Sequence, residues 1–197
     1  SLENRDTILK MVEKTAEEVF IPLTVGGGVR SIENIQNLLK AGADKVSINS
    51  AAIKDPNIIR NSSKYFGSQC IVVAVDVKRD NVSWKVHSHG GTKNTNIDAL
   101  DWLKKVEDLG AGEILLTSMD KDGTKSGFDL EILSRASDIL SIPVIASGGV
   151  GSIEHFYEGV KIGKADALLA ASVFHFNEFS IMDVKNYLKE KNIEVRI

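Results

Sequence analysis

Residues 21–32, IPLTVGGGVRSI, and residues 142–153, IPVIASGGVGSI, carry the same pattern in the same order. Each stretch begins with Ile-Pro, continues with a short apolar run and consecutive glycines, and ends in a Ser-Ile pair. The similarity extends further along the chain, where AGADKVSINS at 41–50 corresponds to GKADALLAAS at 163–172. A matched block of about thirty residues indicates an internal repeat, because self-similarity over such a length identifies duplicated structural units.

The composition is that of an ordinary globular domain. Hydrophobic residues make up 43% of the 197 residues and charged residues 26%. The net charge of -3 argues against a nucleic-acid partner. No apolar run reaches the roughly eighteen residues that a membrane span needs. We therefore expect neither a nucleic-acid nor a membrane partner.

The cysteine and histidine content indicates the cell compartment and the cofactor class. The single cysteine, Cys70, cannot form an internal disulfide, which is typical of a cytoplasmic protein. Because Cys70 lies in the apolar run CIVVAV, we expect a buried structural thiol there. The four histidines and this cysteine show no metal-ligand spacing, so we expect no metal and no other cofactor.

Short apolar runs rich in β-branched residues recur along the chain, and none alternates strictly with polar residues. Such continuous runs are typical of strands that helices cover on both faces. We expect six strands, at 21–27, 45–49, 70–76, 113–118, 142–148 and 167–172.

Segments with helical spacing lie between these runs. The first covers 5–19, and a shorter one lies near 55–65. The others begin near residues that favour helix N-caps, namely Ser31, Asn96, Asp129, Ser152 and Ser180. This strict alternation of strand and helix predicts a parallel sheet.

The repeat decides between an open and a closed sheet. A doubly wound open sheet has one phosphate-binding glycine turn, after its first strand. Here glycines end both the first and the fifth expected strands, which favours a (β/α)8 TIM barrel of half-barrel duplication type. The repeat unit is then four strands long, and we expect residues 1–197 to hold strands 3–8 of a single, N-terminally incomplete barrel domain. A complete six-stranded open sheet is the alternative.

In a TIM barrel the active site lies at the C-terminal ends of the strands. The glycines at 26–28 and 148–149 end two matched strands just before helices, where backbone amides and a helix N-terminus favour an anion. The next strands end in 49–50 (Asn-Ser) and 171–172 (Ala-Ser), which offer further donors. We expect two phosphate pockets on opposite sides of one barrel mouth. The alternative is that the glycines only form tight turns.

Acidic residues follow two other strands. Asp76 ends the apolar run VAVDVKR and is well placed for general acid–base chemistry, although a salt bridge to Lys78 or to a loop arginine would also explain it. Residues 117–127, TSMDKDGTKSG, have the composition of a polar substrate loop whose aspartates could equally cap turns. The candidate residues of this loop are Thr117, Asp120, Asp122 and Gly123.

Residues 80–96 are too long for an ordinary strand-to-helix turn. Their segment VSWKVHSH alternates, which favours a short hairpin over the barrel mouth. His87 and His89 are either acid–base groups in this hairpin or exposed loop residues. Trp102, in a helical segment, is expected to pack in the core.

Seven stretches of the chain resemble the cyclase subunit of imidazole glycerol phosphate synthase, an enzyme of the histidine pathway. They are TVGGGVRS, GADKVSINSAAI, GSQCIVVAVDVKR, HGGTKN, GAGEILLTSMDKDGTKSGFD, IPVIASGGVGSIEHF and LAASVFHF. The sister isomerase of the same pathway shares the glycine phrases but not LTSMDKDGTKSG or AASVFHF in this form. The resemblance runs in order from the first helix to the C-terminus.

The resemblance implies a lyase that converts phosphoribulosyl-formimino-aminoimidazole carboxamide ribonucleotide and ammonia to imidazole glycerol phosphate and aminoimidazole carboxamide ribonucleotide. Of the family's two catalytic aspartates, one matches Asp76, and the other belongs to strands that precede these residues. Residues 1–197 alone are therefore expected to be inactive. Contacts to the two substrate phosphates carry over to Gly28, Asn49 and Ser50 on one side and to Gly123, Gly149, Ala171 and Ser172 on the other.

The same resemblance implies a heterodimer with a glutamine amidotransferase, which docks at the strand N-termini and supplies ammonia. Lys45 and Glu113 match two of the four charged residues at the ammonia entrance. Two alternatives stay open, namely the sister isomerase, which needs no ammonia, and a non-catalytic barrel that binds and regulates a glutaminase.

Overall fold

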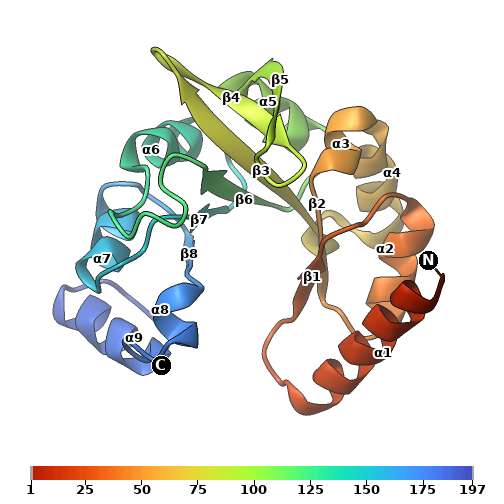
Figure 1. The fold of residues 1–197 in the computed structure, drawn as a ribbon, viewed down its shortest axis with the longest axis horizontal. Helices are drawn as coiled ribbons and strands as arrows, with labels where there is room; N and C mark the ends of the chain where they lie inside the picture. Colours follow the sequence, from red (N-terminus) through yellow and green to blue (C-terminus); the bar gives the residue numbers. More distant parts are fainter. Residues whose placement is uncertain (1, 197) are drawn as a thin grey trace. The chain divides into compact units, whose positions relative to one another are not determined.

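The computed structural model describes residues 2–196, with the side chains from Thr7 onward. The chain divides into two compact units. Unit 1 comprises Ser1–Ala74 and Lys105–Glu113, and unit 2 comprises Val75–Lys104 and Ile114–Ile197. Figure 1 shows the helices and strands of each unit.

The sheet has a sequential strand order. Its main path runs β1-β2-β3-β6-β7-β8, and β4 and β5 form an antiparallel addition to β3. A doubly wound sheet reverses its order part-way, whereas strands that follow one another without reversal are those of a (β/α)8 barrel. The α/β fold with a parallel sheet is therefore confirmed, and its order is that of six consecutive barrel strands. The strands are β1 (Thr24–Gly26), β2 (Lys45–Ile48), β3 (Ile71–Asp80), β4 (Ser83–Ser88), β5 (Lys93–Asp98), β6 (Glu113–Ser118), β7 (Val144–Ser147) and β8 (Ala167–Leu169).

The helices begin largely where cap residues predict. Ser31, Asp129 and Ser180 are confirmed as N-caps, each with a side chain that accepts a backbone N–H of the first turn. The helices are α1 (Leu2–Glu18), α2 (Ile32–Lys40), α3 (Ser50–Lys54), α4 (Asn57–Phe66), α5 (Ala99–Asp108), α6 (Leu130–Ile139), α7 (Glu154–Lys161), α8 (Ser172–His175) and α9 (Ile181–Glu190). None of these described helices is both long and apolar enough to cross a lipid bilayer.

Three local details differ from the expectations. Asn96 lies in β5, and the Asp98 carboxylate instead accepts the backbone N–H of Leu100 at the start of α5, at 3.0 Å. Ser152 lies before α7, and its backbone N–H donates to the ring of His155 at 3.2 Å. Cys70 is half-buried in a 3-10 turn, Ser68–Cys70, that ends just before β3. In each case a neighbouring polar group or a tight turn moved the element boundary.

The internal repeat is visible in the strand register. Val25 of β1 pairs with Val46 of β2, and the equivalent residue Ala146 of β7 pairs with Leu168 of β8. A carboxylate closes each strand pair at its start. Asp44 accepts the N–H of Leu23 at 2.7 Å, and Asp166 accepts the N–H of Val144 at 2.9 Å. The duplicated sequence therefore produces the same hydrogen-bonded unit twice.

These paired carboxylates predict matched stability effects. Asp44→Ala and Asp166→Ala should each lower the free energy of unfolding by about 1–2 kcal/mol, because each leaves a strand N–H without its charged acceptor. Urea unfolding of the two variants and of Asp44→Asn, which keeps an acceptor oxygen, measures this. A loss in only one of the two alanine variants would contradict the structural equivalence of the repeats.

One face of the strands is buried under helices. In unit 2, α6 lies against β7 and α7 against β8 (Figure 1), and Ile114, Leu116, Val144 and Ala146 are almost fully buried. Trp102 is buried as expected, at 3% exposure. Strand residues that alternate with the buried ones, including Thr117 and Ser147, are half-exposed. This second face carries the polar residues of interest.

Candidate functional site

Asp76 lies within a strand rather than at its end. The expected strand to residue 76 continues as β3 to Asp80, turns at 81–82, and returns as β4. Asn81 has a φ of 54°, the left-handed conformation that two-residue hairpin turns require and that Asn tolerates. The hairpin over residues 80–96 is therefore confirmed, and Asp76 is half-buried at its base.

The strand register places His87 beside Asp76. The two residues are directly opposite in the antiparallel ladder, so their side chains project from the same face. His87 is 8% exposed, and its Nδ1 lies 3.1 Å from the carbonyl oxygen of Lys85. The interpretation of His87 as an exposed loop residue was wrong, because the hairpin continues past it. His89 is exposed, with a φ of 55°.

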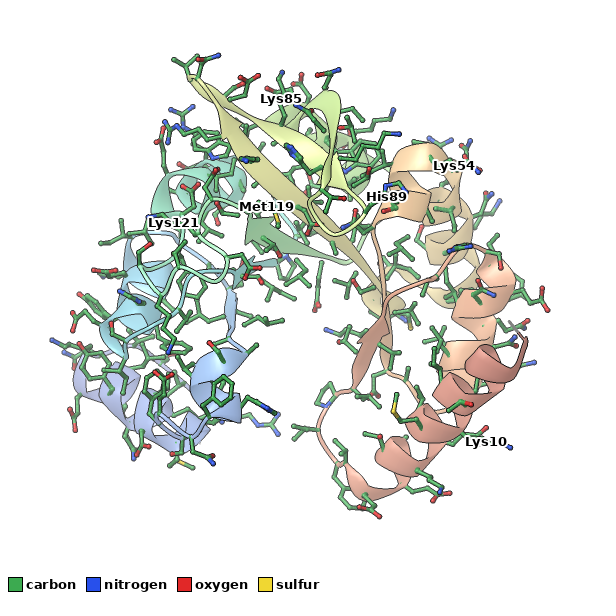
Figure 2. The ribbon with its side chains drawn as sticks, in the orientation of Figure 1. Lys10, Lys54, Lys85, His89, Met119 and Lys121 are labelled. Carbon is green, nitrogen blue, oxygen red and sulfur yellow. The ribbon has the colours of Figure 1, made fainter. Side chains whose placement is uncertain are left out.

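The loop after β6 is joined to the hairpin by its backbone. Met119 donates its N–H to the carbonyl oxygen of Val77 at 2.8 Å, and Arg79 donates its N–H to the Asp120 carboxylate at 2.7 Å. Asp120 is therefore a structural acceptor, one of the two roles left open for the aspartates of this loop. The Met119 side chain (labelled in Figure 2) also lies close to the segment that follows β4. A Cβ placed on Gly91 of that segment would lie 2.3 Å from the Met119 methyl carbon.

Asp122 and Gly123 form the tip of the same loop. Both are exposed, and the N–H of Asp122 donates to the carbonyl oxygen of Ser118 at 2.9 Å. Gly123 has a φ of +75° and no atom within 4 Å of a built Cβ. Thr117, at the end of β6, is half-exposed opposite Ser147. The loop thus leaves a carboxylate and an accessible backbone open to a ligand.

The matched glycine turns differ in their surroundings. Gly28 has a φ of +69°, and a Cβ built on it meets nothing within 4 Å. Gly149 has a φ of +104°, and its Cβ would lie 2.1 Å from the carbonyl oxygen of Gly127. The N–H of Gly127 also donates to the carbonyl oxygen of Gly149 at 2.7 Å. Backbone packing therefore explains Gly149 without a ligand, whereas the open space at Gly28 leaves room for one.

The donor residues after the glycine turns are equivalent in the two repeats. Asn49 and Ala171 are the N-caps of the short helices α3 and α8, and Ser50 and Ser172 are the first residues of those helices. Each pair lies after a strand of its own unit, β2 in unit 1 and β8 in unit 2. The structure thus places the expected donors at matching positions.

Lys45 and Glu113 form an ion pair within unit 1. Each is the first residue of its strand, β2 and β6, and the Lys45 ammonium donates to the Glu113 carboxylate. Their side chains are 27% and 21% exposed. The sequence singled out both residues, and the structure brings them together.

Two arginines and a glutamate form a charged network between the hairpin and α6. Arg79 and Arg135 both donate to the Glu131 carboxylate at 2.8 Å. The hydrogen bond from Arg79 is the main reason why the pKa of Glu131 is lowered, and the same bond raises the pKa of Arg79. Because the folded state favours the ionised carboxylate, this interaction stabilises the fold above the ordinary Glu pKa of 4.5 and is lost at lower pH.

Acid titration tests this network. Glu131→Gln should reduce the loss of unfolding free energy as the pH falls below 4.5, because the variant has no carboxylate to protonate. The effect should be modest, since the group is solvent-screened. Urea unfolding at neutral and acid pH measures it, with Glu190→Gln at the end of α9 as the control. Equal acid sensitivity of Glu131→Gln and the unaltered protein would contradict the assignment.

No metal centre is visible in the part of the chain that the structure describes, where no three His, Cys, Asp or Glu side chains gather closely enough to hold an ion.

The sequence matches the model of a known protein family. The model of the family described as histidine biosynthesis protein matches residues 1–180. This match includes every strand of the parallel sheet and ends at Ser180, the N-cap of α9.

Proposed function

Because the chain belongs to the histidine biosynthesis protein family, whose members are isomerases or cyclases of that pathway, we propose that it is a cyclase. It takes phosphoribulosyl-formimino-aminoimidazole carboxamide ribonucleotide and ammonia. The products are imidazole glycerol phosphate and aminoimidazole carboxamide ribonucleotide. A glutamine amidotransferase, bound as the second subunit of a heterodimer, supplies the ammonia.

The ion pair between Lys45 and Glu113 is the observation that favours a cyclase over an isomerase. Both side chains begin strands, and the active site of a barrel enzyme lies at the opposite ends of its strands. An isomerase has one substrate, which enters at that opposite end, and has no need of polar groups here. A half-buried ion pair costs desolvation energy that apolar residues would avoid. A path for a small polar molecule such as ammonia gives this pair a function.

In this proposal each of the two repeats binds one phosphate group of the substrate. In unit 1 one phosphate binds at the open glycine turn and the N-terminus of α3, through Gly28, Asn49 and Ser50. In unit 2 the second binds at the equivalent elements, through Gly123, Gly149, Ala171 and Ser172. Backbone N–H groups beside positive-φ glycines are suitable ligands for phosphate oxygens. Thr117 and Asp122, both in unit 2, are the further substrate-binding residues of the proposal.

Asp76 is the general acid–base group in this proposal. It is half-buried at the base of the hairpin, on the face that also carries His87. Ring closure requires protons to leave the attacking nitrogen and to reach the leaving group. A carboxylate within hydrogen-bond reach can carry out both transfers.

Removal of the Lys45 side chain should affect turnover with glutamine and turnover with added ammonium differently. In the protein as the cell makes it, Lys45→Ala should lower glutamine-driven turnover with the amidotransferase by about tenfold, a change of about 1.4 kcal/mol. Turnover driven by added ammonium salt should change less than twofold. Lys54→Ala, at the exposed last residue of α3 in the same unit, is the control and should change neither. Equal losses with both ammonia sources would contradict an ammonia-entry role.

The function itself is tested by supplying two substrates in parallel. The protein should consume the bis-phosphate substrate only when ammonium is present, and it should leave the precursor of the sister isomerase unchanged. Conversion of that precursor without ammonium would show an isomerase instead.

A further inference from the structure

Trp84, on β4 of the hairpin, is almost fully buried, with 1% of its surface exposed. It pairs with Arg79 across the β3–β4 ladder, so both side chains project from one face of the hairpin. Asp76 is three residues before Arg79, and successive strand side chains point to opposite faces. Trp84 therefore lies on the face away from Asp76 and can affect it only through the backbone.

Two guanidinium groups pack against the Trp84 ring. The Cζ of Arg79 lies 4.6 Å from the ring centroid, and the Cζ of Arg135 lies 5.4 Å from it. Both arginines bind the Glu131 carboxylate on α6, which keeps them in position. Cation–π contacts of this kind stabilise a desolvated indole. The ring is thus fixed between the hairpin and the first turns of α6.

The indole N–H determines how the hairpin is joined to the rest of unit 2. Nε1 of Trp84 donates to Oδ2 of Asp129 at 3.0 Å, and the Ser118 hydroxyl donates to the same oxygen at 3.1 Å. Asp129 is also the N-cap of α6, where it accepts the N–H of Ile132. We name these three residues, Trp84, Asp129 and Ser118, the Asp129 bridge. The bridge joins β4, the end of β6 and the start of α6 through one carboxylate.

The loop of residues 119–127 lies between two fixed points. At its start, the hydrogen bonds from Met119 to Val77 and from Arg79 to Asp120 hold it to β3. Just after its end, Asp129 is held to β4 by Trp84. Both ends of this loop are therefore bound to the hairpin that carries Asp76.

We infer that Trp84 is a positioning residue that fixes the Asp76 hairpin relative to the loop carrying Asp122 and Gly123. The expected effect of Trp84 on turnover rests on the proposed function. The expected effect of Trp84 on how firmly the hairpin is held rests on the geometry alone. Within the described residues, the Trp84–Asp129 hydrogen bond is a direct side-chain link from β4 to the segment that follows the loop. Loss of the indole N–H leaves the packing of an aromatic ring but removes this link.

The rate of catalysis depends on the distance between Asp76 and the substrate. The rate of proton transfer falls steeply when the acid–base group is displaced, and about 1 Å of misplacement can cost about a hundredfold in rate. Most of the proposed phosphate contacts lie outside the loop that the bridge holds, and only Gly123 lies on it. Weakening the bridge should therefore lower kcat by a larger factor than it raises KM.

Trp84→Phe tests the inference, with Trp102→Phe on α5 as the matched control for the loss of an indole in the same unit. Amide hydrogen exchange of the protein as the cell makes it should become about tenfold faster at Arg79 and Met119, whose N–H groups hold the loop to β3. The kcat for ammonium-driven turnover should fall about tenfold, with KM changed less than threefold. Trp102→Phe should alter neither quantity.

Asp129→Asn provides the second variant. Its single carbonyl oxygen can accept either from Trp84 and Ser118 or from the Ile132 N–H, and its NH2 group then faces the other donors. Its exchange rates and kcat should lie between those of the unaltered protein and those of Trp84→Phe. Unchanged exchange in Trp84→Phe, or faster exchange with unchanged kcat, would overturn the positioning role. Absence of ammonium-driven turnover in the unaltered protein would instead contradict the proposed function, and the exchange rates would then decide the role of Trp84 by themselves.

Discussion

Asp76→Asn should lower ammonium-driven turnover by about 10²–10⁴-fold, the usual contribution of a general acid–base group. Asn has the same shape but cannot take up or release a proton near neutral pH. Because the phosphate contacts lie elsewhere, the affinity for the bis-phosphate substrate should change less than threefold. Rapid-mixing turnover and calorimetric substrate titration measure the two quantities separately.

Asp80→Asn is the matched control for this variant. Asp80 lies on the same strand and the same face as Asp76, at the exposed tip of the hairpin, where it accepts a hydrogen bond from the Asn81 side chain at 3.1 Å. Its replacement should leave turnover within twofold. A similar loss in both variants would show that hairpin charge, rather than proton transfer at Asp76, limits the reaction.

Gly149→Ala should lower the free energy of unfolding by about 3 kcal/mol or more, since it combines backbone strain with overpacking. Its φ of +104° disfavours any side chain, and the added methyl group would lie 2.1 Å from the carbonyl oxygen of Gly127. Both loops would have to move apart, which would break the hydrogen bond between Gly127 and Gly149. Urea unfolding with a constant m-value gives the loss directly.

Gly28→Ala, at the equivalent position of the other repeat, should behave differently. Its φ of +69° lies in the left-handed region, where alanine costs about 1–2 kcal/mol, and no atom lies within 4 Å of the added methyl group. The methyl group would instead occupy the space that the proposal assigns to phosphate. Substrate affinity should fall about tenfold, a change of about 1.4 kcal/mol. Equal losses of stability at the two glycines, with unchanged affinity at Gly28, would contradict the assignment of an open phosphate site.

The repeat was the part of the sequence that predicted most of the structure. Its equivalent residues Val25 and Ala146 occupy equivalent places in the ladder, because a duplicated apolar pattern fixes the register twice. The six strands of the parallel sheet could also be predicted, since continuous apolar runs between helical segments are typical of strands that helices cover. Lys45 and Glu113 were identified from the resemblance to the cyclase subunit, and the structure places both at strand starts.

The links within unit 2 could not be predicted in the same way. That His87 is buried depends on the antiparallel partner of β3, and the length of that hairpin depends on one left-handed residue, Asn81. The bond between Trp84 and Asp129 joins residues far apart in the sequence, and no periodicity signals it. A tryptophan in an alternating polar segment was the one available hint, because a buried indole N–H needs an acceptor.

The different surroundings of Gly28 and Gly149 were also beyond sequence reasoning. Both residues belong to the same motif and both have positive φ. What separates them is the path of the loop that contains Gly127, which approaches one copy of the motif only. Sequence identity between repeats therefore predicted equal backbone conformation but not equal packing.

The most direct test of the cyclase proposal is the fate of isotopically labelled ammonia. The protein as the cell makes it is incubated with the bis-phosphate substrate and ¹⁵N-ammonium, and the products are separated and analysed by mass spectrometry. The account predicts that ¹⁵N enters the imidazole product and is absent from the carboxamide ribonucleotide. Product formation without ammonium, or products that carry no ¹⁵N, would contradict it.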